Sequence, residues 1–131
     1  MILVDTSVLI DFLRGTKNKE SRKLESILQM KIPFGISSFI FQEILQGADS
    51  EKEYHLLKNY LTTQRFYNPK DSVESFAKAA RIYMDCRKKG IIIRSTIDCA
   101  IAVTALEHDL FLLHNDNDYV LMQKVVPLKF Y

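Results

Sequence analysis

Glycine, cysteine and tryptophan are scarce in this sequence, whose 131 residues include four glycines, two cysteines and no tryptophan. The chain lacks the Gly-x-Gly-x-x-Gly loop of dinucleotide-binding folds, and no other glycine-rich phosphate loop is evident. Cys86 and Cys99 do not form a Cys-x-x-Cys pair, and each lies in a segment with a helical pattern. We therefore expect both to be packing thiols in a reducing cytoplasm.

Long apolar runs and a strong excess of one charge are also missing. Asp5 interrupts the apolar start of the chain at once, and no later apolar run approaches the length of a membrane span, about 20 residues. We expect a soluble cytoplasmic protein that is not exported and has no membrane partner. The formal net charge of +2 is too small to indicate nucleic-acid binding by itself.

Short apolar runs alternate with segments of helical periodicity along the whole chain. The alternation predicts an α/β fold, a three-layer α/β/α sandwich around a mostly parallel five-stranded sheet. At 131 residues and 47% hydrophobic content, we expect the chain to form one domain, residues 1–131. The predicted strands are Ile2–Val4, Phe34–Ile36, Phe66–Tyr67, Asp109–Leu113 and Val125–Phe130, the last at an edge because Pro127 cannot donate to a ladder.

Three aspartates lie where such sheets form their sites, just beyond the carboxyl ends of the strands. Asp5 ends the first strand, Asp98 lies in the first turn of an almost wholly apolar helix, and Asp116 follows Leu112 and Leu113. Glu43 differs from them because it lies within the helix after the second strand, where it borders the buried stripe.

Each aspartate also has a purely structural explanation as a helix cap, and the spacing from Ser95 to Asp98 fits a capping box. Four acids at one sheet edge would nevertheless repel one another and have raised pKa values unless a cation neutralised them. Ligands that are all oxygen favour Mg²⁺ or Mn²⁺ over zinc. Asp116 to Asp118 is not a calcium loop, because Val120 stands at the next ligand position and the glycine is missing.

Four stretches of this sequence, in order and correctly spaced, resemble the PIN-domain nucleases, and among them the VapC toxins of toxin–antitoxin pairs. The resemblance covers essentially the whole length, and the stretches that carry it are Val4–Asp11, Glu43–Gly47, Arg94–Ala102 and Leu112–Tyr119. It implies the sheet order 3-2-1-4-5 and one or two Mg²⁺ or Mn²⁺ ions held by Asp5, Glu43, Asp98 and Asp116. It also implies an RNA substrate, commonly transfer or ribosomal RNA, a homodimer, and a small VapB-like antitoxin that obstructs the active site.

Two positions depart from the family's pattern. His114 stands where the family often has Thr or Ser, and Asp118 is an additional acid that competes with Asp116 for the fourth place. We rank Asp116 first because it is closer to the end of the strand. Thr6 is the expected supporting hydroxyl, orienting Asp5 or a metal-bound water, and Asn115 is a further supporting residue.

The substrate phosphates need positive partners around this acidic pocket, and the candidates are Arg14, Lys17 and Arg94. Six basic residues stand against two acids from residue 14 to residue 31, which fits either a solvated helix face or a phosphate-facing rim. Arg94 is the preferred candidate because it is close to Asp98 in the sequence.

The residues offer no nucleophile paired with a base, so the attacking group is expected to be water, positioned or deprotonated by Glu43. The predicted function is a metal-dependent endoribonuclease acting as a toxin that inhibits translation. The alternative is a catalytically silent PIN-like module that binds RNA or protein. Phosphoryl transfer of the haloacid dehalogenase type is disfavoured, because Ser7 stands where that chemistry needs a second aspartate.

Overall fold

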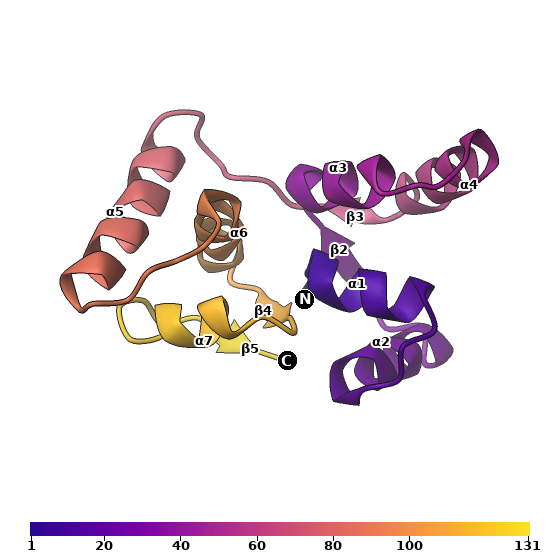
Figure 1. Ribbon diagram of the computed structural model, residues 1–131, viewed down its shortest axis with the longest axis horizontal. Helices are drawn as coiled ribbons and strands as arrows, with labels where there is room; N and C mark the ends of the chain where they lie inside the picture. Colours follow the sequence, from indigo (N-terminus) through magenta and orange to yellow (C-terminus); the bar gives the residue numbers. More distant parts are fainter.

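The computed structural model describes residues 1–131, which form a sheet of five parallel strands in the order β3-β2-β1-β4-β5 (Figure 1). The predicted order is therefore confirmed, and the sheet is wholly parallel. The strands are β1 (Ile2–Val4), β2 (Phe34–Ile36), β3 (Arg65–Phe66), β4 (Phe111–Leu113) and β5 (Lys129–Phe130). The helices are α1 (Thr6–Leu13), α2 (Lys19–Gln29), α3 (Ser38–Gln46), α4 (Glu51–Leu61), α5 (Glu74–Lys88), α6 (Thr96–Glu107) and α7 (Asn117–Met122).

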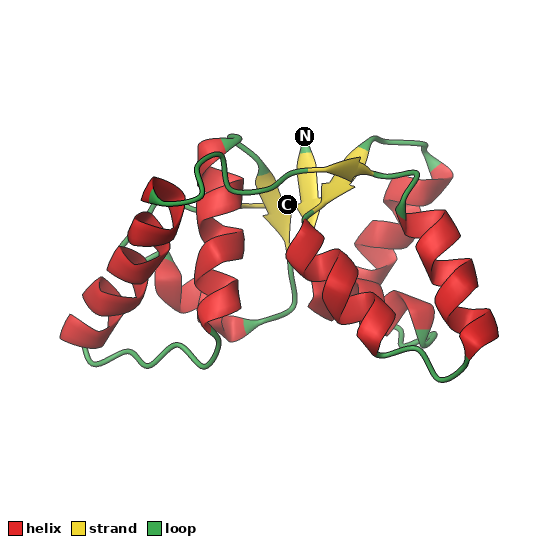
Figure 2. Cartoon of the chain, turned by 90° about the horizontal axis from the view of Figure 1, so that it is seen from above, coloured by secondary structure: helices red, strands yellow, loops and turns green.

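Two groups of helices enclose the sheet, as the three-layer prediction requires. Figure 2 shows the strands between them, and the main contacts between helices occur within α1 to α4 on one side and within α5 to α7 on the other. Right-handed crossovers explain this division. The chain moves across the sheet in one direction from β1 to β3 and in the other from β3 to β5, so the connecting helices lie on opposite faces.

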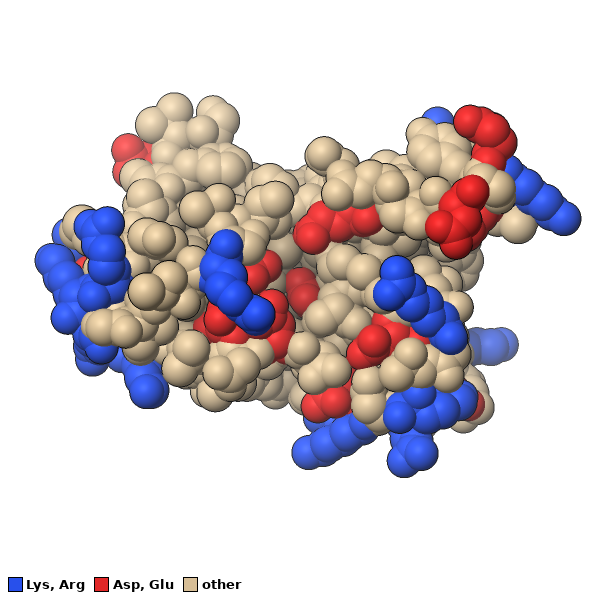
Figure 3. Space-filling view, viewed as in Figure 1, with Lys and Arg blue, Asp and Glu red and all other residues tan.

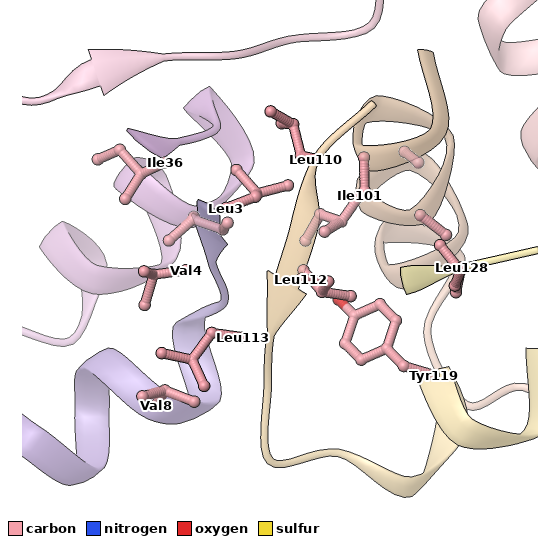
Figure 4. Close-up of a cluster of buried hydrophobic side chains, with 14 of the residues drawn as sticks. Leu3, Val4, Val8, Ile36, Ile101, Leu110, Leu112, Leu113, Tyr119 and Leu128 are labelled. Atoms are coloured by element: carbon pink, nitrogen blue, oxygen red, sulfur yellow. The ribbon is translucent and has the colours of Figure 1, made fainter. Parts of the chain in front are cut away.

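The central strands are buried on both faces, which accounts for their continuous apolar sequences. Leu3, Val4, Ile36 and Leu112 have at most a trace of exposed surface. They pack against apolar side chains from the helices, among them Ile101 of α6 (Figure 4). Neighbouring elements cover α6 on almost all sides, which accounts for the apolar residues on nearly every face of this helix.

The two edge strands are shorter or shifted relative to the prediction. Only Lys129 and Phe130 of the predicted strand from Val125 pair with β4. The amide groups of Val125 and Val126 both donate to the carbonyl of Met122, so this stretch is a turn that closes α7. Edge strands have one neighbour only, and their apolar composition does not define where pairing begins.

The predicted bounds of β1 and β2 are confirmed, whereas β4 begins at Phe111 instead of Asp109. The third strand is Arg65–Phe66 instead of Phe66–Tyr67, although the Tyr67 amide still donates to the Ile36 carbonyl. The short helix α7 begins at Asn117, with Asp116 as its cap.

Cys86 and Cys99 are both buried and unpaired, which confirms their prediction as packing thiols. None of the helices is both long enough and apolar enough to span a membrane.

Candidate active site

Asp5 lies where β1 meets α1, and every contact of its carboxylate orients it. Its amide donates to the Leu113 carbonyl at 2.9 Å, which fixes the end of β1 beside the end of β4. The amide and hydroxyl of Ser7 donate to Oδ2 at 3.1 and 2.7 Å, and the Tyr119 hydroxyl donates to Oδ1 at 2.9 Å. Asp5 is therefore a helix cap, as its structural explanation requires, but only through one of its two oxygens.

Glu43 reaches the same place from α3. The hydroxyl of Thr6 donates to its Oε1 at 3.2 Å, which joins the first turn of α1 to the middle of α3. Burial raises the pKa of Glu43, the Thr6 hydrogen bond lowers it, and the charge of Asp5 raises it again, with a net increase. Thr6 therefore contacts Glu43 and not Asp5, which its neighbour Ser7 orients, and the expectation that Thr6 orients a metal-bound water stays a prediction.

Asp98 lies in the first turn of α6, and it does not form the predicted capping box. Ser95 is the N-cap residue of this helix, but its side chain makes no capping hydrogen bond. Burial is the main cause that raises the pKa of Asp98, the charges of Asp5, Asp116, Glu43 and Asp118 add to it in that order, and together they bring it to about 7. A half-buried carboxylate with no capping role, surrounded by four other acids, is what a cation site requires.

Asp116 and Asp118 both follow β4, but their surroundings differ. Asp116 is the N-cap residue of α7, and its Oδ1 accepts from the Asp118 amide at 2.9 Å and from the Arg94 guanidinium at 3.2 Å. Asp118 is buried, and its Oδ2 accepts from the backbone amide of Arg94 at 3.1 Å and from its Nε at 3.4 Å. Asp118 therefore ties the loop before α6 to the start of α7.

Asn115 belongs to a polar network with Ser7 and Asp11. Its amide donates to the Ser7 hydroxyl at 3.0 Å, and its side chain donates to Asp11 Oδ2 at 3.3 Å. The Asn18 side chain donates to the same Asp11 oxygen at 2.8 Å. The network connects the loop after β4 to both ends of the connection between α1 and α2.

His114 supports Asp116 without facing the acids as a ligand. Its Nδ1 accepts from the Asp116 amide at 3.1 Å, so the neutral ring carries its proton on Nε2. The ring packs against Tyr119 and Phe130, with centroid distances of 5.0 and 4.3 Å. Burial lowers the pKa of His114, which favours this neutral form.

Tyr119 is the residue at this site that the sequence analysis missed. It is fully buried, and its hydroxyl contacts both Asp5 and Asp98. A tyrosine directly after Asp118 in a short helix is typical of ordinary core packing. The only signal in the sequence is its phenol, which has to find a polar partner when it is buried.

The three basic residues proposed as phosphate ligands differ in their position relative to the acids. Arg94 is bonded to Asp116 and Asp118, with 74% of its side chain exposed. Arg14 borders a groove of about 120 Å³ that Glu43 also lines, whereas Lys17 pairs with Glu25 at 3.4 Å on the surface. Figure 3 shows acidic side chains gathered near the middle of this face, with basic ones around them.

The donor set fits a hard divalent cation. Oxygens of Asp98, Asp116 and Asp118 lie within 4.8 Å of one another, and no histidine or thiolate is among them. Asp5 joins the group because the Tyr119 hydroxyl lies within 3.4 Å of an oxygen of Asp5 and of Asp98. We call these three acids, with Asp5 and Glu43, the acidic centre. Carboxylate oxygens of this kind are typical ligands of Mg²⁺ and Mn²⁺.

The chain is similar to known proteins over nearly its full length. Ribonuclease VapC11 of Mycobacterium tuberculosis is 28% identical to it over 130 residues, which are 98% of this chain and 96% of that protein. The crystal structure of VapBC2 from Rickettsia felis bound to a DNA fragment from their promoter matches with a TM-score of 0.74 at 18% identity, over 100% of this chain and 98% of the other. The crystal structure of FitAcB from Neisseria gonorrhoeae matches with a TM-score of 0.69 at 22% identity, over 100% and 96%.

These structural matches establish a shared fold. Residues 2–125 match the PIN domain family, the family that the four motifs of the sequence resemble. With this match over almost the entire chain, and with the sheet order 3-2-1-4-5 that the resemblance implies, the chain belongs to the PIN domain family.

Proposed function

We propose that this protein is a metal-dependent endoribonuclease and the toxin of a toxin–antitoxin pair. The observation that carries the proposal is the convergence of five acids from four segments, at a place where burial and the charges of the neighbouring acids together raise the pKa of Asp98 to about 7. A protein gains nothing in stability from such repulsion, so the acids require a ligand that offsets it. The VapC ribonucleases to which the chain is similar support RNA as the substrate.

Asp5, Asp98 and Asp116 would hold the ion, which is Mg²⁺ or Mn²⁺, and Glu43 would complete the set through the attacking water. Asp5 can offer only Oδ1, because Ser7 occupies Oδ2 with two hydrogen bonds. When it is bound, the ion acts as a Lewis acid on the scissile phosphate and on the attacking water. Both effects are needed because the centre contains no nucleophilic side chain of its own.

Glu43 is the proposed general base. Its raised pKa brings it closer to neutral pH, where a base is most effective, and the Thr6 hydroxyl fixes its orientation. The water oxygen bonds to phosphorus, its proton passes to Glu43, and the bond from phosphorus to the 3′ oxygen breaks. The leaving 3′ oxygen takes a proton from solvent, so the products carry 5′-phosphate and 3′-hydroxyl ends.

Arg94 is the proposed phosphate ligand closest to the acids. Its ion pairs with Asp116 and Asp118 involve an exposed side chain, and such pairs are weak enough to rearrange. The guanidinium can therefore turn from the carboxylates to a substrate phosphate, which it would bind through two N–H groups. Arg14 and Lys17 are proposed as outer contacts with the RNA.

Asp116, and not Asp118, is the proposed fourth ligand. Asp118 is buried and already bonded to the amide and side chain of Arg94. We expect Asp116→Asn to abolish cleavage and Mn²⁺ binding with little effect on the melting temperature in EDTA. Asp118→Asn should lower that temperature and leave measurable cleavage. The reverse pattern would give the fourth place to Asp118.

The proposed partners are a VapB-like antitoxin that obstructs the acidic centre, and a second copy of the chain. VapBC2 of Rickettsia felis, which shares the fold, was crystallised as a toxin–antitoxin pair on promoter DNA. An apolar hollow of about 350 Å³ between α3, α5 and α6 offers a face for the second copy. Phe39, Phe76, Tyr83 and Ile97 line it.

The direct test is cleavage of total RNA, followed by mapping of the cut ends. The purified protein should cut RNA with Mg²⁺ or Mn²⁺ and leave 5′-phosphate and 3′-hydroxyl ends, and the cut molecules should be transfer or ribosomal RNA. EDTA and Asp98→Asn should each abolish cleavage. Undiminished cleavage in EDTA, or 2′,3′-cyclic phosphate ends, would refute the mechanism. RNA that is bound but never cut would favour the silent binding module.

A further inference from the structure

Tyr119 places a buried hydroxyl between two acids of the centre. The side chain comes from α7, has no exposed surface, and points into the interior between β4 and α6 (Figure 4). Its hydroxyl oxygen lies 2.9 Å from Oδ1 of Asp5 and 3.4 Å from Oδ1 of Asp98. One phenol oxygen thus contacts carboxylates that come from two different segments of the chain.

The hydroxyl has one proton, and the two distances show where it is donated. The shorter contact is with Asp5, so Asp5 Oδ1 accepts the proton and the longer contact leaves Asp98 without it. Ser7 holds the other oxygen of Asp5 with two hydrogen bonds. Asp5 is consequently fixed at both oxygens, and one lone pair of Oδ1 is left to face the acidic centre.

Packing alone does not require a phenol at this position. The ring packs at a tilt against His114 and fills apolar space, which phenylalanine would do equally well. A buried hydroxyl has to be matched by a partner or it destabilises the fold, and here the partner is the carboxylate next to the proposed ion. The hydroxyl therefore acts on the acidic centre and adds nothing that the core itself needs.

We propose that Tyr119 is a positioning residue that fixes the rotation of Asp5 and its spacing from Asp98, so that each offers Oδ1 to a divalent cation. The proposal rests on the metal-dependent function proposed above. Residues that hold a ligand in this way commonly change metal affinity about 10-fold or more when they are removed. Tyr119 itself touches neither substrate nor ion.

The test compares Tyr119→Phe with the unaltered protein by titrating Mn²⁺ in the absence of RNA. Free Mn²⁺ is followed by electron paramagnetic resonance, and heat is followed by calorimetry. We expect the Mn²⁺ dissociation constant to rise about 10-fold, while the melting temperature in EDTA changes little. In RNA cleavage at non-saturating Mn²⁺, kcat should fall and KM for RNA should stay the same.

Tyr83→Phe is the matched control, because it removes a phenol from α5 that lines the apolar hollow. It should leave Mn²⁺ affinity unchanged. Equal Mn²⁺ affinity of Tyr119→Phe and the unaltered protein overturns the proposal, as does a Tyr119→Phe variant that fails to fold or an unaltered protein that binds no Mn²⁺.

The titration also separates this proposal from the nuclease function. If Mn²⁺ binding weakens in Tyr119→Phe but no RNA is cut by the unaltered protein, the nuclease function fails and the positioning role stands. If RNA is cut and both proteins bind Mn²⁺ equally, the nuclease function stands and the positioning role fails.

Discussion

Asp98 is the carboxyl group in which burial and charge repulsion combine most strongly. Its carboxyl group has a pKa of about 7 in the folded protein against an ordinary value of 3.8. In the metal-free state, the folded chain therefore holds a proton that the unfolded chain has already lost between about pH 4 and pH 7. Repulsion among the acids lowers the stability of the apoprotein when Asp98 is ionised, and the same repulsion favours the binding of a cation.

The sign of this linkage gives a pH prediction. The stability that protonated Asp98 contributes is fully present below about pH 4 and is lost as the pH rises through about 7. The melting temperature in EDTA should fall between pH 5 and pH 8, and Asp98→Asn should flatten that fall. Mn²⁺ at pH 8 should raise the melting temperature of the unaltered protein and not that of Asp98→Asn. Parallel pH curves for the two proteins would show that Asp98 is not the group responsible.

Thr6 gives a second prediction, which concerns the base. Its hydrogen bond lowers the pKa of Glu43, so Thr6→Val should raise that pKa further and keep the base protonated to higher pH. The acidic limb of the pH–rate profile should move to higher pH, with a rate loss at pH 6 that shrinks at pH 8. Thr6→Ser keeps the hydroxyl and should retain the original limb. A loss of rate that is equal at all pH values would instead indicate a defect in folding or in RNA binding.

The connections between elements bring the acids together. Asp5 and Asp116 follow adjacent parallel strands, Asp98 begins a helix that returns across the sheet, and Glu43 is carried by α3. Only the two strand-end residues are positioned by the sheet itself. Asp98 depends on how α5 ends and on the loop that leads into α6, which Asp118 holds through Arg94.

The end of α5 can be tested at a glycine. Gly90 has φ of +77° with open space around it, so a side chain there meets backbone strain and no clash. Gly90→Ala should lower the free energy of unfolding by about 1 kcal/mol. Gly47 also ends a helix but has φ of −87°, and Gly47→Ala should be neutral or slightly stabilising. Urea denaturation measures both, and an equal loss in the two variants would contradict the conformational explanation.

The molecule as a whole has a polar, acidic face and a separate apolar hollow. Phe76 and Ile97 at the hollow are 45% and 39% exposed, and Phe76 packs edge-on against Phe39. Exposed apolar groups that cluster in this way mark protein contact surfaces more often than scattered ones do. This is the face on which the proposed homodimer depends.

Phe76→Arg should therefore weaken self-association. Light scattering after size exclusion should show a dimer for the unaltered protein and a smaller species for the variant, because a charge is buried without a partner at the contact. Met30→Arg is the control, since Met30 is 63% exposed and lies at the end of α2, away from the hollow. A dimer that persists in Phe76→Arg would place the contact elsewhere.

Local patterns in the sequence were enough to predict the layers, the sheet order through its family resemblance, and the positions of Asp5, Asp98 and Asp116 relative to the strands. Buried parallel strands have continuous apolar sequences, and Asp5 and Asp116, which follow two adjacent strands, have to lie at one edge, so the layers and these two positions follow from the order of residues alone. The boundaries of β3 and β5 did not follow, because an edge strand pairs only as far as its single neighbour allows.

Only the tertiary structure determined which side chain contacts which acid of the acidic centre. Thr6 and Ser7 are adjacent on α1 and point about 100° apart, so one reaches Glu43 and the other Asp5. Asp118 and Tyr119 likewise turn inward to different partners. These directions depend on how each helix is rotated against the sheet, and that rotation is set by packing between segments far apart in the chain.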